Sequence, residues 1–377
     1  MILKQLNIKN FRNYDDASIS LSDGINIFYG NNAQGKTNLL ESIYFLSFTK
    51  SHRSYTDSNL IKNGESFLRI GGTLKKNELF DTKLEITLEK DKKNIFIDGD
   101  SYKKVSDYIT KMNIVIFYPE DLDIIKGAPA IRRRYLNSEI CQYDSNYLIS
   151  LNNFKKIQKI RNDYLKRGSL YIDEQYLKVL NDYFIDCSIE IYKARSSFIY
   201  DLNQLIESIF FDLTGMHGFK IEYENNFNVE NFLNYEGDLK NDFSIKLDHC
   251  FESEMKQGCS LVGPHKDDFS FYLEDLNLKN YGSQGQQRLS VLSLKLAEVI
   301  LLNKYNNDTP ILLLDDVFSE LDDEKKNKLL KYINQDIQTI ITTTDLKNID
   351  DSIIKNSKLF KINNGMIEIE EVGSCGK

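Results

Sequence analysis

Residues 30–37 read Gly-Asn-Asn-Ala-Gln-Gly-Lys-Thr, and their types and spacing are suited to binding phosphate. The two glycines let the backbone turn tightly, so that successive N–H groups can approach an anion closely. The lysine that follows neutralises phosphate charge, and the hydroxyl after it can ligate Mg²⁺. The segment matches the P-loop pattern G-x-x-x-x-G-K-[ST], which predicts a nucleotide-binding site. Its residues are Gly30, Asn31, Asn32, Ala33, Gln34, Gly35, Lys36 and Thr37.

The segments on either side of this loop have the periodicity that the motif requires. Residues 25–29 form a short apolar run that is typical of a buried strand. Residues 38–48 carry apolar side chains at helical spacing, so the predicted order is strand, glycine loop and helix. The alternative, an ordinary turn, is disfavoured because this order is the one that the motif needs.

Two consecutive carboxylates, Asp315 and Asp316, end a second apolar run at residues 311–314. Aliphatic residues in succession predict a strand buried on both faces of a mainly parallel sheet. At the carboxyl end of such a strand, Asp315 can hold Mg²⁺ together with Thr37, and Asp316 can orient the attacking water. Without a P-loop the same residues would indicate only an acidic turn. With the P-loop, we predict that Asp316 and Lys36 are catalytic and that Thr37 and Asp315 are metal ligands.

A third segment, residues 281–288, reads Tyr-Gly-Ser-Gln-Gly-Gln-Gln-Arg and leads into a predicted helix at residues 286–303. A serine can cap a helix start, and a glycine lets the first backbone amides point outward, so this is a second candidate anion site. A chain with two phosphate-binding helix starts often uses them on different molecules. We therefore predict that this helix start contacts ATP held by a second copy of the chain. Its candidate residues are Ser283, Gly285, Gln286 and Gln287.

The order of these three segments resembles that of the ABC-type ATPases of DNA maintenance, the SMC-like group. Within that group the chain is most similar to the RecF family of bacterial recombination proteins. Further landmarks of that family follow in the same order and cover nearly the whole chain. They are Leu6–Tyr14, Ser51–Ser54, Phe117–Leu122, Gly127, Arg132–Arg134, Leu261–Asp268 and Ser319–Asp322.

The resemblance implies both a fold and a function. The fold is of the α/β class: an ABC-type P-loop ATPase head with an antiparallel side-sheet and an inserted, mainly helical domain. The function is ATP-dependent DNA binding in recombinational repair and replication, with Mg²⁺ as the second cofactor and an ATP-dependent homodimer that closes on DNA. The resemblance further implies loading of recombinase at single-strand gaps, with RecR and RecO as partners.

The pattern of elements predicts three segments along the chain. Residues 1–125 form the first part of the ATPase head, residues 126–260 the inserted helical domain, and residues 261–377 the second part of the head. Residues 17–21 are predicted to form a strand, and strand-like runs at residues 67–74, 84–88 and 95–97 predict the antiparallel side-sheet. Helices are predicted within residues 131–166 and 171–213, where apolar residues recur every three or four positions.

The charge distribution indicates where a polyanion could bind. The chain of 377 residues carries a formal net charge of −8, which by itself disfavours contact with DNA. Residues 126–170, however, hold ten Lys and Arg against three acidic residues, a local net charge of +7 that leaves −15 for the rest. Such a basic island is suited to contact with phosphate, although ordinary solvated helix faces also carry clusters of Lys and Arg. The candidate DNA-binding residues are Arg132, Arg133, Arg134, Lys155, Lys156 and Lys159.

Other features predict a cytoplasmic protein. No apolar run approaches the roughly 18 residues of a membrane helix, and the N-terminus lacks a signal-peptide core. The five cysteines include no C-x-x-C pair, as expected of reduced thiols. A zinc site at His249, Cys250, Cys259 and His265 is disfavoured because their spacing matches no usual finger. The sequence gives His265 no definite role.

Two rival functions share some of these motifs. The ATP-binding subunit of an ABC transporter is one, but such compact subunits lack the long insertion that separates Gly30 from Ser283. A small-molecule P-loop kinase is the other, and it would have no use for the segment that begins at Ser283.

Two departures from the usual ABC pattern predict slow hydrolysis. Asp316 is one methylene shorter than the Glu that many ABC ATPases place there. Thr342, Thr343 and Thr344 follow the next strand, where many have a switch His. Both changes leave the attacking water less well polarised, so we expect weak ATPase activity that acts as a switch.

Overall fold

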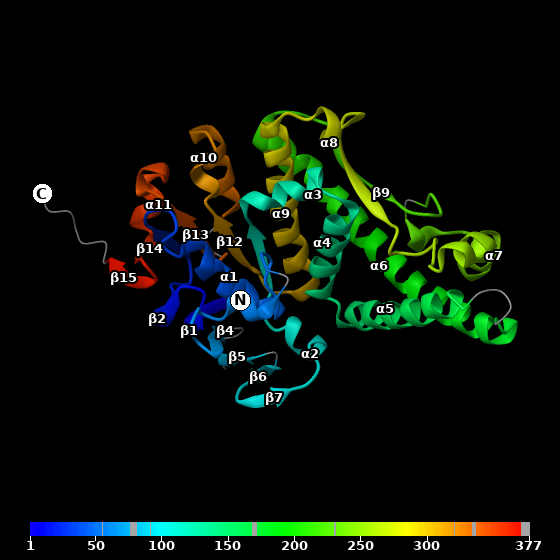
Figure 1. The fold of residues 1–377 in the computed structure, drawn as a ribbon. Helices are drawn as coiled ribbons and strands as arrows, with labels where there is room; N and C mark the ends of the chain where they lie inside the picture. The colour runs from blue at the N-terminus through cyan, green and yellow to red at the C-terminus, as the bar shows by residue number, and fades with distance from the viewer. Residues whose placement is uncertain are drawn as a thin grey trace, which may run out of the picture. The chain divides into compact units, whose positions relative to one another are not determined.

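The computed structural model describes residues 1–54, 56–75, 81–90, 92–167, 172–229, 231–319, 321–333 and 337–370. The chain forms two compact units, and Figure 1 labels their helices and strands. Unit 1 comprises residues 1–121, 212–214 and 292–377, and unit 2 comprises residues 122–211 and 215–291. Among the described residues, no helix is long and apolar enough to cross a membrane.

Unit 1 contains a mainly parallel sheet with the strand order β15-β14-β3-β13-β12-β8, in which only β15 pairs antiparallel. Every residue of β12 and β13 is buried, as expected for central strands of a parallel sheet. The strands are β3 (Ile25–Tyr29), β8 (Ile114–Phe117), β12 (Ile311–Asp315), β13 (Thr339–Thr343), β14 (Ser357–Asn363) and β15 (Met366–Glu370).

A helix follows the loop after β3 and packs on this sheet. It is α1 (Lys36–Phe48), which contacts β12 and β13, and its N-terminus lies at the carboxyl ends of the parallel strands. The order strand, loop and helix predicted for residues 25–48 is therefore present. The other short elements of unit 1 are η1 (Asp57–Leu60), α2 (Ser106–Ile109), η2 (Pro119–Leu122), η5 (Val317–Ser319), α10 (Asp323–Tyr332), η6 (Leu346–Asn348) and α11 (Asp351–Lys355).

The second sheet of unit 1 is antiparallel, with the order β2-β1-β4-β5-β6-β7. Its buried residues alternate with half-buried or exposed ones, most regularly in β4, where Leu68, Ile70, Gly72 and Leu74 are buried. This sheet is the side-sheet that strand-like runs in the sequence predict. Its strands are β1 (Ile2–Phe11), β2 (Tyr14–Ser20), β4 (Phe67–Lys75), β5 (Asp81–Glu89), β6 (Lys92–Ile97) and β7 (Asp100–Tyr102).

Unit 2 is mainly helical, as predicted for the insertion. Asp144 caps α5 and Asp173 caps α6, each by accepting two backbone N–H bonds at the helix start. α5 and α6 share an apolar cluster that includes Tyr164 and Leu177. The helices are α3 (Asp123–Lys126), α4 (Pro129–Cys141), α5 (Ser145–Leu165), α6 (Glu174–Thr214), η4 (Phe232–Asn234), α7 (Leu239–Gln257) and α8 (Leu278–Tyr281).

Unit 2 also contains a small antiparallel sheet, and this sheet places the second boundary of the unit later in the chain than predicted. The sheet has the order β11-β10-β9, formed by β9 (Phe219–Glu224), β10 (Asp268–Leu273) and β11 (Leu276–Asn277). Because β10 pairs with β9 along its whole length, unit 2 extends to residue 291 instead of the predicted residue 260. The first boundary, after residue 121, lies close to the predicted residue 125. α9 (Gln284–Asn306) begins in unit 2 and continues in unit 1.

Candidate nucleotide-binding site

The glycine loop between β3 and α1 has the backbone that the P-loop pattern predicts. Gly30 and Gly35 have φ angles of 153° and 115°, in the region that disfavours other residues. A Cβ at Gly30 would lie 2.4 Å from the Ile362 carbonyl oxygen, and one at Gly35 would lie 2.5 Å from Asn13 Nδ2. Gly30 therefore requires glycine for steric as well as conformational reasons, because its neighbour is backbone, and Gly35 requires it for its backbone conformation. The outer residues of the loop, Asn31, Asn32 and Ala33, are exposed.

Two turns of unit 1 hold this loop from different elements. Asn13, in the β1–β2 turn, donates from Nδ2 to the Gln34 carbonyl oxygen at 3.0 Å. Gly365, in the β14–β15 turn, donates its N–H to the same oxygen at 3.0 Å, and Asn364 N–H bonds Gln34 Oε1 at 2.7 Å. Tyr14 donates its hydroxyl to the Gly35 carbonyl oxygen at 3.0 Å. The loop is thus preorganised by residues from both ends of the chain.

Lys36 lies folded into the loop. Its Nζ donates to the carbonyl oxygens of Gly30 at 2.6 Å and Asn31 at 2.8 Å, and its side chain is buried. Burial lowers the pKa of Lys36, while the negative charges of Asp316 and Asp315 act in the opposite direction. The ammonium group is therefore held at the centre of the loop, where an incoming phosphate would meet it.

The two carboxylates predicted to handle metal and water lie at the end of β12, next to the start of α1. Asp315 Oδ1 accepts hydroxyl bonds from Thr37 at 3.1 Å and from Thr342 at 2.5 Å. Burial raises the pKa of Asp315, and these two hydrogen bonds oppose the rise. Asp316 has a φ of 54°, and its Oδ1 is buried without a hydrogen-bond partner.

These groups fit a Mg²⁺ ion. Carboxylate and hydroxyl oxygens are hard ligands of the kind that Mg²⁺ prefers, and the unpartnered Asp316 oxygen is a polar atom that a metal-bound or attacking water would satisfy. The structure thus brings together Lys36, Thr37, Asp315 and Asp316, as the sequence predicts. Thr342 is not among the predicted site residues. Of the landmark Ser319–Asp322, Glu320 lies outside the described residues.

Two other landmark segments meet behind α1. Glu41 is fully buried, and Arg12 contacts its carboxylate from Nε at 2.9 Å and from its terminal nitrogen at 2.7 Å. Burial raises the pKa of Glu41, but hydrogen bonds from Arg12 and Ser51 outweigh burial, so the pKa lies below its ordinary value. Arg53 donates to Asn38 Oδ1 at 3.1 Å. This network anchors the helix that carries Lys36 and Thr37.

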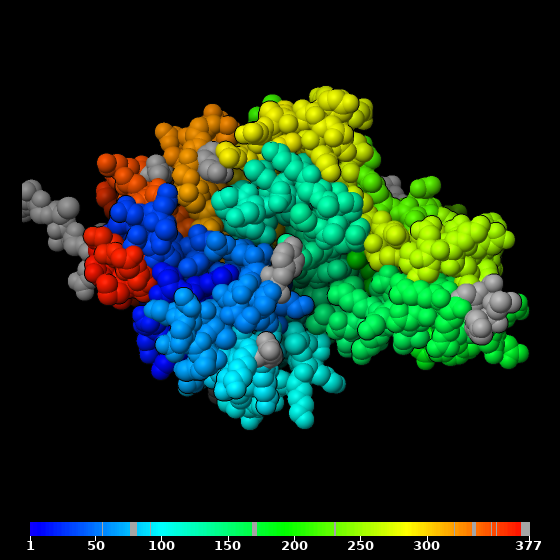
Figure 2. Space-filling model, viewed as in Figure 1, coloured from blue at the N-terminus to red at the C-terminus, as the bar shows by residue number. Residues whose placement is uncertain are grey.

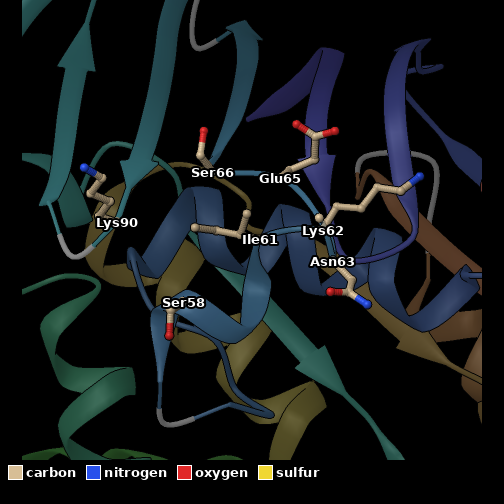
Figure 3. A pocket seen from close by; sticks show the side chains of 8 residues that line it. Ser58, Ile61, Lys62, Asn63, Glu65, Ser66 and Lys90 are labelled. Carbon is tan, nitrogen blue, oxygen red and sulfur yellow. The ribbon is translucent and has the colours of Figure 1, made fainter.

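Two surface cavities of unit 1 differ in their relation to the loop. One, of about 450 Å³, lies against the P-loop and is lined by Gly30, Asn31 and Gln34 together with residues 344–346 and 361–364. The other, of about 360 Å³, is lined by Ser58, residues 61–66 and Lys90 (Figure 3). Figure 3 labels Lys62 and Glu65 among its lining residues, and none of the predicted site residues is among them. Of these two cavities, only the first is lined by residues of the predicted nucleotide site.

The second predicted anion site, at the start of α9, is a capped helix N-terminus in unit 2. Ser283 N–H donates to Gln286 Oε1 at 2.8 Å, and Gln286 N–H donates to Ser283 Oγ at 3.2 Å. This reciprocal pair is a capping box. Gly285 is exposed, and the nearest atom to a Cβ placed on it would be Ser283 Oγ at 4.0 Å. The structure argues against Gln287 as a contact, because it is buried and donates to the Leu278 carbonyl oxygen.

The predicted DNA-binding residues separate into buried and exposed groups. Arg132 is buried and makes a two-pronged ion pair with Asp268, at 2.5 and 2.8 Å, so the structure argues against its contacting DNA. Arg133 donates to the Asp267 carbonyl oxygen at 2.8 Å and is half-buried. The exposed candidates are Arg134 on α4 and Lys155, Lys156 and Lys159 on α5. Figure 2 shows the surface of α5, in green.

The Gly-Pro-His-Lys-Asp-Asp segment, residues 263–268, is an anchor point of the unit 2 core. Asp267 is buried, and its Oδ2 accepts from Arg195 at 2.9 Å and from the Tyr223 hydroxyl at 2.5 Å. Burial raises the pKa of Asp267 to about 6, against the lowering influence of Arg195. Arg195 also donates to the Pro264 carbonyl oxygen at 2.6 Å. The segment therefore ties α6 to the sheet, which explains residues whose role the sequence left open.

His265 belongs to the same core. One ring nitrogen, Nε2, lies 2.9 Å from the Ser260 carbonyl oxygen, and since a carbonyl only accepts, Nε2 carries the proton. Nδ1 is buried without a partner, and the ring packs against Phe154 and Phe184. Burial lowers the pKa of His265 to about 4. The histidine is thus a neutral core residue.

We expect His265→Gln to reduce the acid sensitivity of the fold. A histidine whose pKa is about 4 when folded stabilises the protein fully above its unfolded pKa of about 6.5, and this contribution decreases progressively as the pH falls from 6.5 and is lost below 4. The loss amounts to roughly 3 kcal/mol for the wild type. Urea unfolding of both proteins at pH 7.5 and pH 4.5 measures it. An equal loss of the free energy of unfolding between pH 7.5 and pH 4.5 in the two proteins would contradict this account. Asp267 titrates in both proteins, so its contribution cancels in the comparison.

Comparisons with known proteins agree with these observations. Residues 2–368 match the family model described as the RecF/RecN/SMC N terminal domain. The chain is 40% identical over 369 residues to the DNA replication and repair protein RecF of Streptococcus gordonii, which covers 98% of this chain and 100% of that protein.

Solved structures give the same result. One is the recombination mediator protein RecF with ATP, of the RecFOR pathway, with a TM-score of 0.90, 31% identity, and coverage of 98% of this chain and 97% of that one. The Smc head domain of Pyrococcus furiosus has a TM-score of 0.53 at 16% identity, covering 98% and 95% of the two chains, and shows a likeness of fold alone. The predicted α/β ATPase-head fold class is therefore confirmed.

Proposed function

The chain belongs to the RecF family of DNA replication and repair proteins, and from this premise we propose that it is an ATP-dependent DNA-binding protein of recombinational repair. The observation that carries the proposal is the meeting of Lys36 and Thr37 with Asp315 and Asp316 at the carboxyl ends of the parallel strands. The solved relative named with ATP supports the same nucleotide here. In open α/β sheets this edge is where ligands bind.

The chain's own residues suggest a division of work at this site. The loop amides and Lys36 bind and neutralise phosphate, Thr37 and Asp315 hold Mg²⁺, and Asp316 orients the attacking water. Mg²⁺ supplies charge neutralisation on the phosphate oxygens when bound. Because Asp316 is shorter than the glutamate of many ABC ATPases, we expect slow hydrolysis. Slow hydrolysis suits a switch that sets when DNA is released better than it suits a metabolic enzyme.

A second copy of the chain completes the site in this proposal. The exposed start of α9, with Ser283 capping the helix and Gly285 open to solvent, supports contact with ATP bound to another molecule. Closure of such a homodimer would hold DNA, and hydrolysis would release it. The membership of the solved relative in the RecFOR pathway supports RecO and RecR as partners, and loading of recombinase at single-strand gaps as the outcome, in the cytoplasm.

The exposed lysines of α5 are the DNA surface that we propose. Lys155, Lys156 and Lys159 lie within one helical turn, so they can contact successive phosphates. Replacing all three by Ala should weaken binding to any DNA sequence, because phosphate contacts act through counterion release. We expect the slope of log affinity against log salt to flatten by up to roughly 0.9 for each phosphate that the variant no longer neutralises.

The test combines DNA binding with ATP hydrolysis. We expect DNA to stimulate the slow ATPase of the wild type, and the α5 triple variant to lose most of that stimulation at moderate salt. A matched control replaces Lys325, Lys328 and Lys331 of α10, two of which are already paired with acidic neighbours. It changes the net charge equally and should leave the salt slope intact. An unchanged slope in the α5 variant would place the DNA surface elsewhere.

The same assay separates the rival functions. An ATPase that DNA leaves unaffected would contradict the proposal and favour a transporter subunit. Phosphate transfer to a small molecule, with no turnover in its absence, would favour a P-loop kinase.

A further inference from the structure

We propose that Thr342 is a positioning residue of the nucleotide site, which holds the Asp315 carboxylate and the backbone of Asp316 in place for the metal ion. The inference rests on the proposed ATPase function and adds to it a residue of β13. Neither the P-loop nor the carboxylate pattern points to this residue, because it lies on a different strand.

The register of two parallel strands places Thr342 beside the carboxylates. β12 pairs with β13 so that Asp315 is opposite Thr342. The Thr342 hydroxyl donates to Asp315 Oδ1 at 2.5 Å and accepts the Asp316 N–H at 3.1 Å. A hydroxyl has one proton to donate and lone pairs that accept, so it can donate to Asp315 and accept the Asp316 N–H at the same time. One side chain therefore orients both consecutive acidic residues.

Asp315 accepts from a second hydroxyl, that of Thr37, but this hydroxyl is also proposed to bind Mg²⁺. Thr37 Oγ1 lies 3.1 Å from the same carboxylate oxygen, and Thr37 is the P-loop residue proposed to ligate Mg²⁺. Its hydrogen bond to Asp315 competes with that role. Thr342 is fully buried in a central strand, and a β-branched side chain has few rotamers, so its bond to Asp315 persists when Thr37 reorients.

Removing the hydroxyl leaves the surrounding backbone paired. Asp316 N–H also lies 3.2 Å from the Thr342 carbonyl oxygen, so Thr342→Val keeps a backbone partner for it while removing the donor to Asp315. Valine has nearly the same shape as threonine. Thr342→Ser keeps the hydroxyl without the methyl group, and Thr342→Ala removes both.

The same strand offers a matched control. Thr339 is also fully buried in β13, but its hydroxyl donates to the Ile337 carbonyl oxygen at 3.1 Å, away from the carboxylates. Thr339→Val therefore makes the same chemical change in the same strand without touching the proposed site.

The experiment measures nucleotide binding as a function of Mg²⁺ concentration, with a fluorescent ATP analogue and with no hydrolysis required. We expect Thr342→Val and Thr342→Ala to raise the Mg²⁺ concentration for half-maximal binding by ~10- to 100-fold, as loss of a partner that orients a metal ligand does. Binding of the analogue in EDTA should stay at the wild-type level. Thr342→Ser and Thr339→Val should both behave as the wild type.

The outcomes separate this inference from the proposed function. If the wild type binds no nucleotide with or without Mg²⁺, the proposed function fails and the inference falls with it. If the wild type shows Mg²⁺-dependent binding and folded Thr342→Val and Thr342→Ala have the same Mg²⁺ requirement, the inference alone is overturned. Thermal unfolding in EDTA without nucleotide establishes which variants are folded, and the Ala variant decides the question if the Val variant is not. An equal rise in the Mg²⁺ concentration for half-maximal binding in Thr339→Val would also overturn the inference, because the effect would then not be specific to Thr342.

Discussion

Replacing Lys36 by methionine is expected to remove most of the nucleotide affinity of the protein without unfolding it. The Lys36 ammonium lies at the centre of the glycine loop, held by the carbonyl oxygens of Gly30 and Asn31. A charge-assisted contact to phosphate is worth about 1.5–3 kcal/mol, or roughly 10- to 150-fold in affinity. Methionine has a similar length, so it fills the same space without the charge. Equilibrium titration with a fluorescent ATP analogue in the presence of Mg²⁺ measures the loss.

A matched control is available in the same unit. Lys93 is a partly buried lysine, and it donates to the Thr49 carbonyl oxygen and to Asp57. Lys93→Met should cost stability but leave nucleotide affinity near the wild-type value. If a folded Lys36→Met protein bound and hydrolysed ATP normally, the loop at residues 30–37 would not be the nucleotide site.

The parts of the site that the sequence predicts are those encoded by contiguous residues. A P-loop is a local backbone structure, so its glycines, Lys36 and Thr37 can be recognised from spacing alone. The end of a buried strand is also local, which is why the sequence alone led to the prediction that Asp315 binds the metal and Asp316 orients the water. Their meeting with Thr37 follows from the rule that ligands bind at the carboxyl ends of parallel strands.

Contacts between distant residues could not be predicted in the same way. Asn364 and Gly365 reach the P-loop only because β14 lies beside β3, and Thr342 meets Asp315 only because β13 lies beside β12. Charge in a sequence also carries no information about burial. Arg132 adds to the count of the basic island, yet it is buried against Asp268, and only the tertiary structure distinguishes it from exposed Lys155.

Ser283→Arg tests whether two molecules build one site. The start of α9 is exposed, so a bulky cation there should block the approach of the γ-phosphate held by another molecule. We expect ATP affinity of the monomer to remain near wild type, because Lys36 and Thr37 are untouched, and ATP-dependent dimerisation to be abolished. The substitution also removes the hydroxyl that caps Gln286 N–H, which costs the helix ~1 kcal/mol. Ser283→Ala removes only that cap, so it should dimerise better than the arginine variant.

Asp316→Asn should have the opposite effect. Asparagine tolerates the positive φ of this position and keeps the shape of the side chain, but an amide cannot serve as the base for an attacking water. The proposed metal ligands and both helix starts remain, so the variant should bind ATP, dimerise and stay closed, with hydrolysis reduced by ~10²- to 10⁴-fold. Sedimentation with and without ATP compares all three variants with the wild type. A Ser283→Arg protein that still dimerises on adding ATP would leave the P-loop as a nucleotide site but remove the second molecule from it.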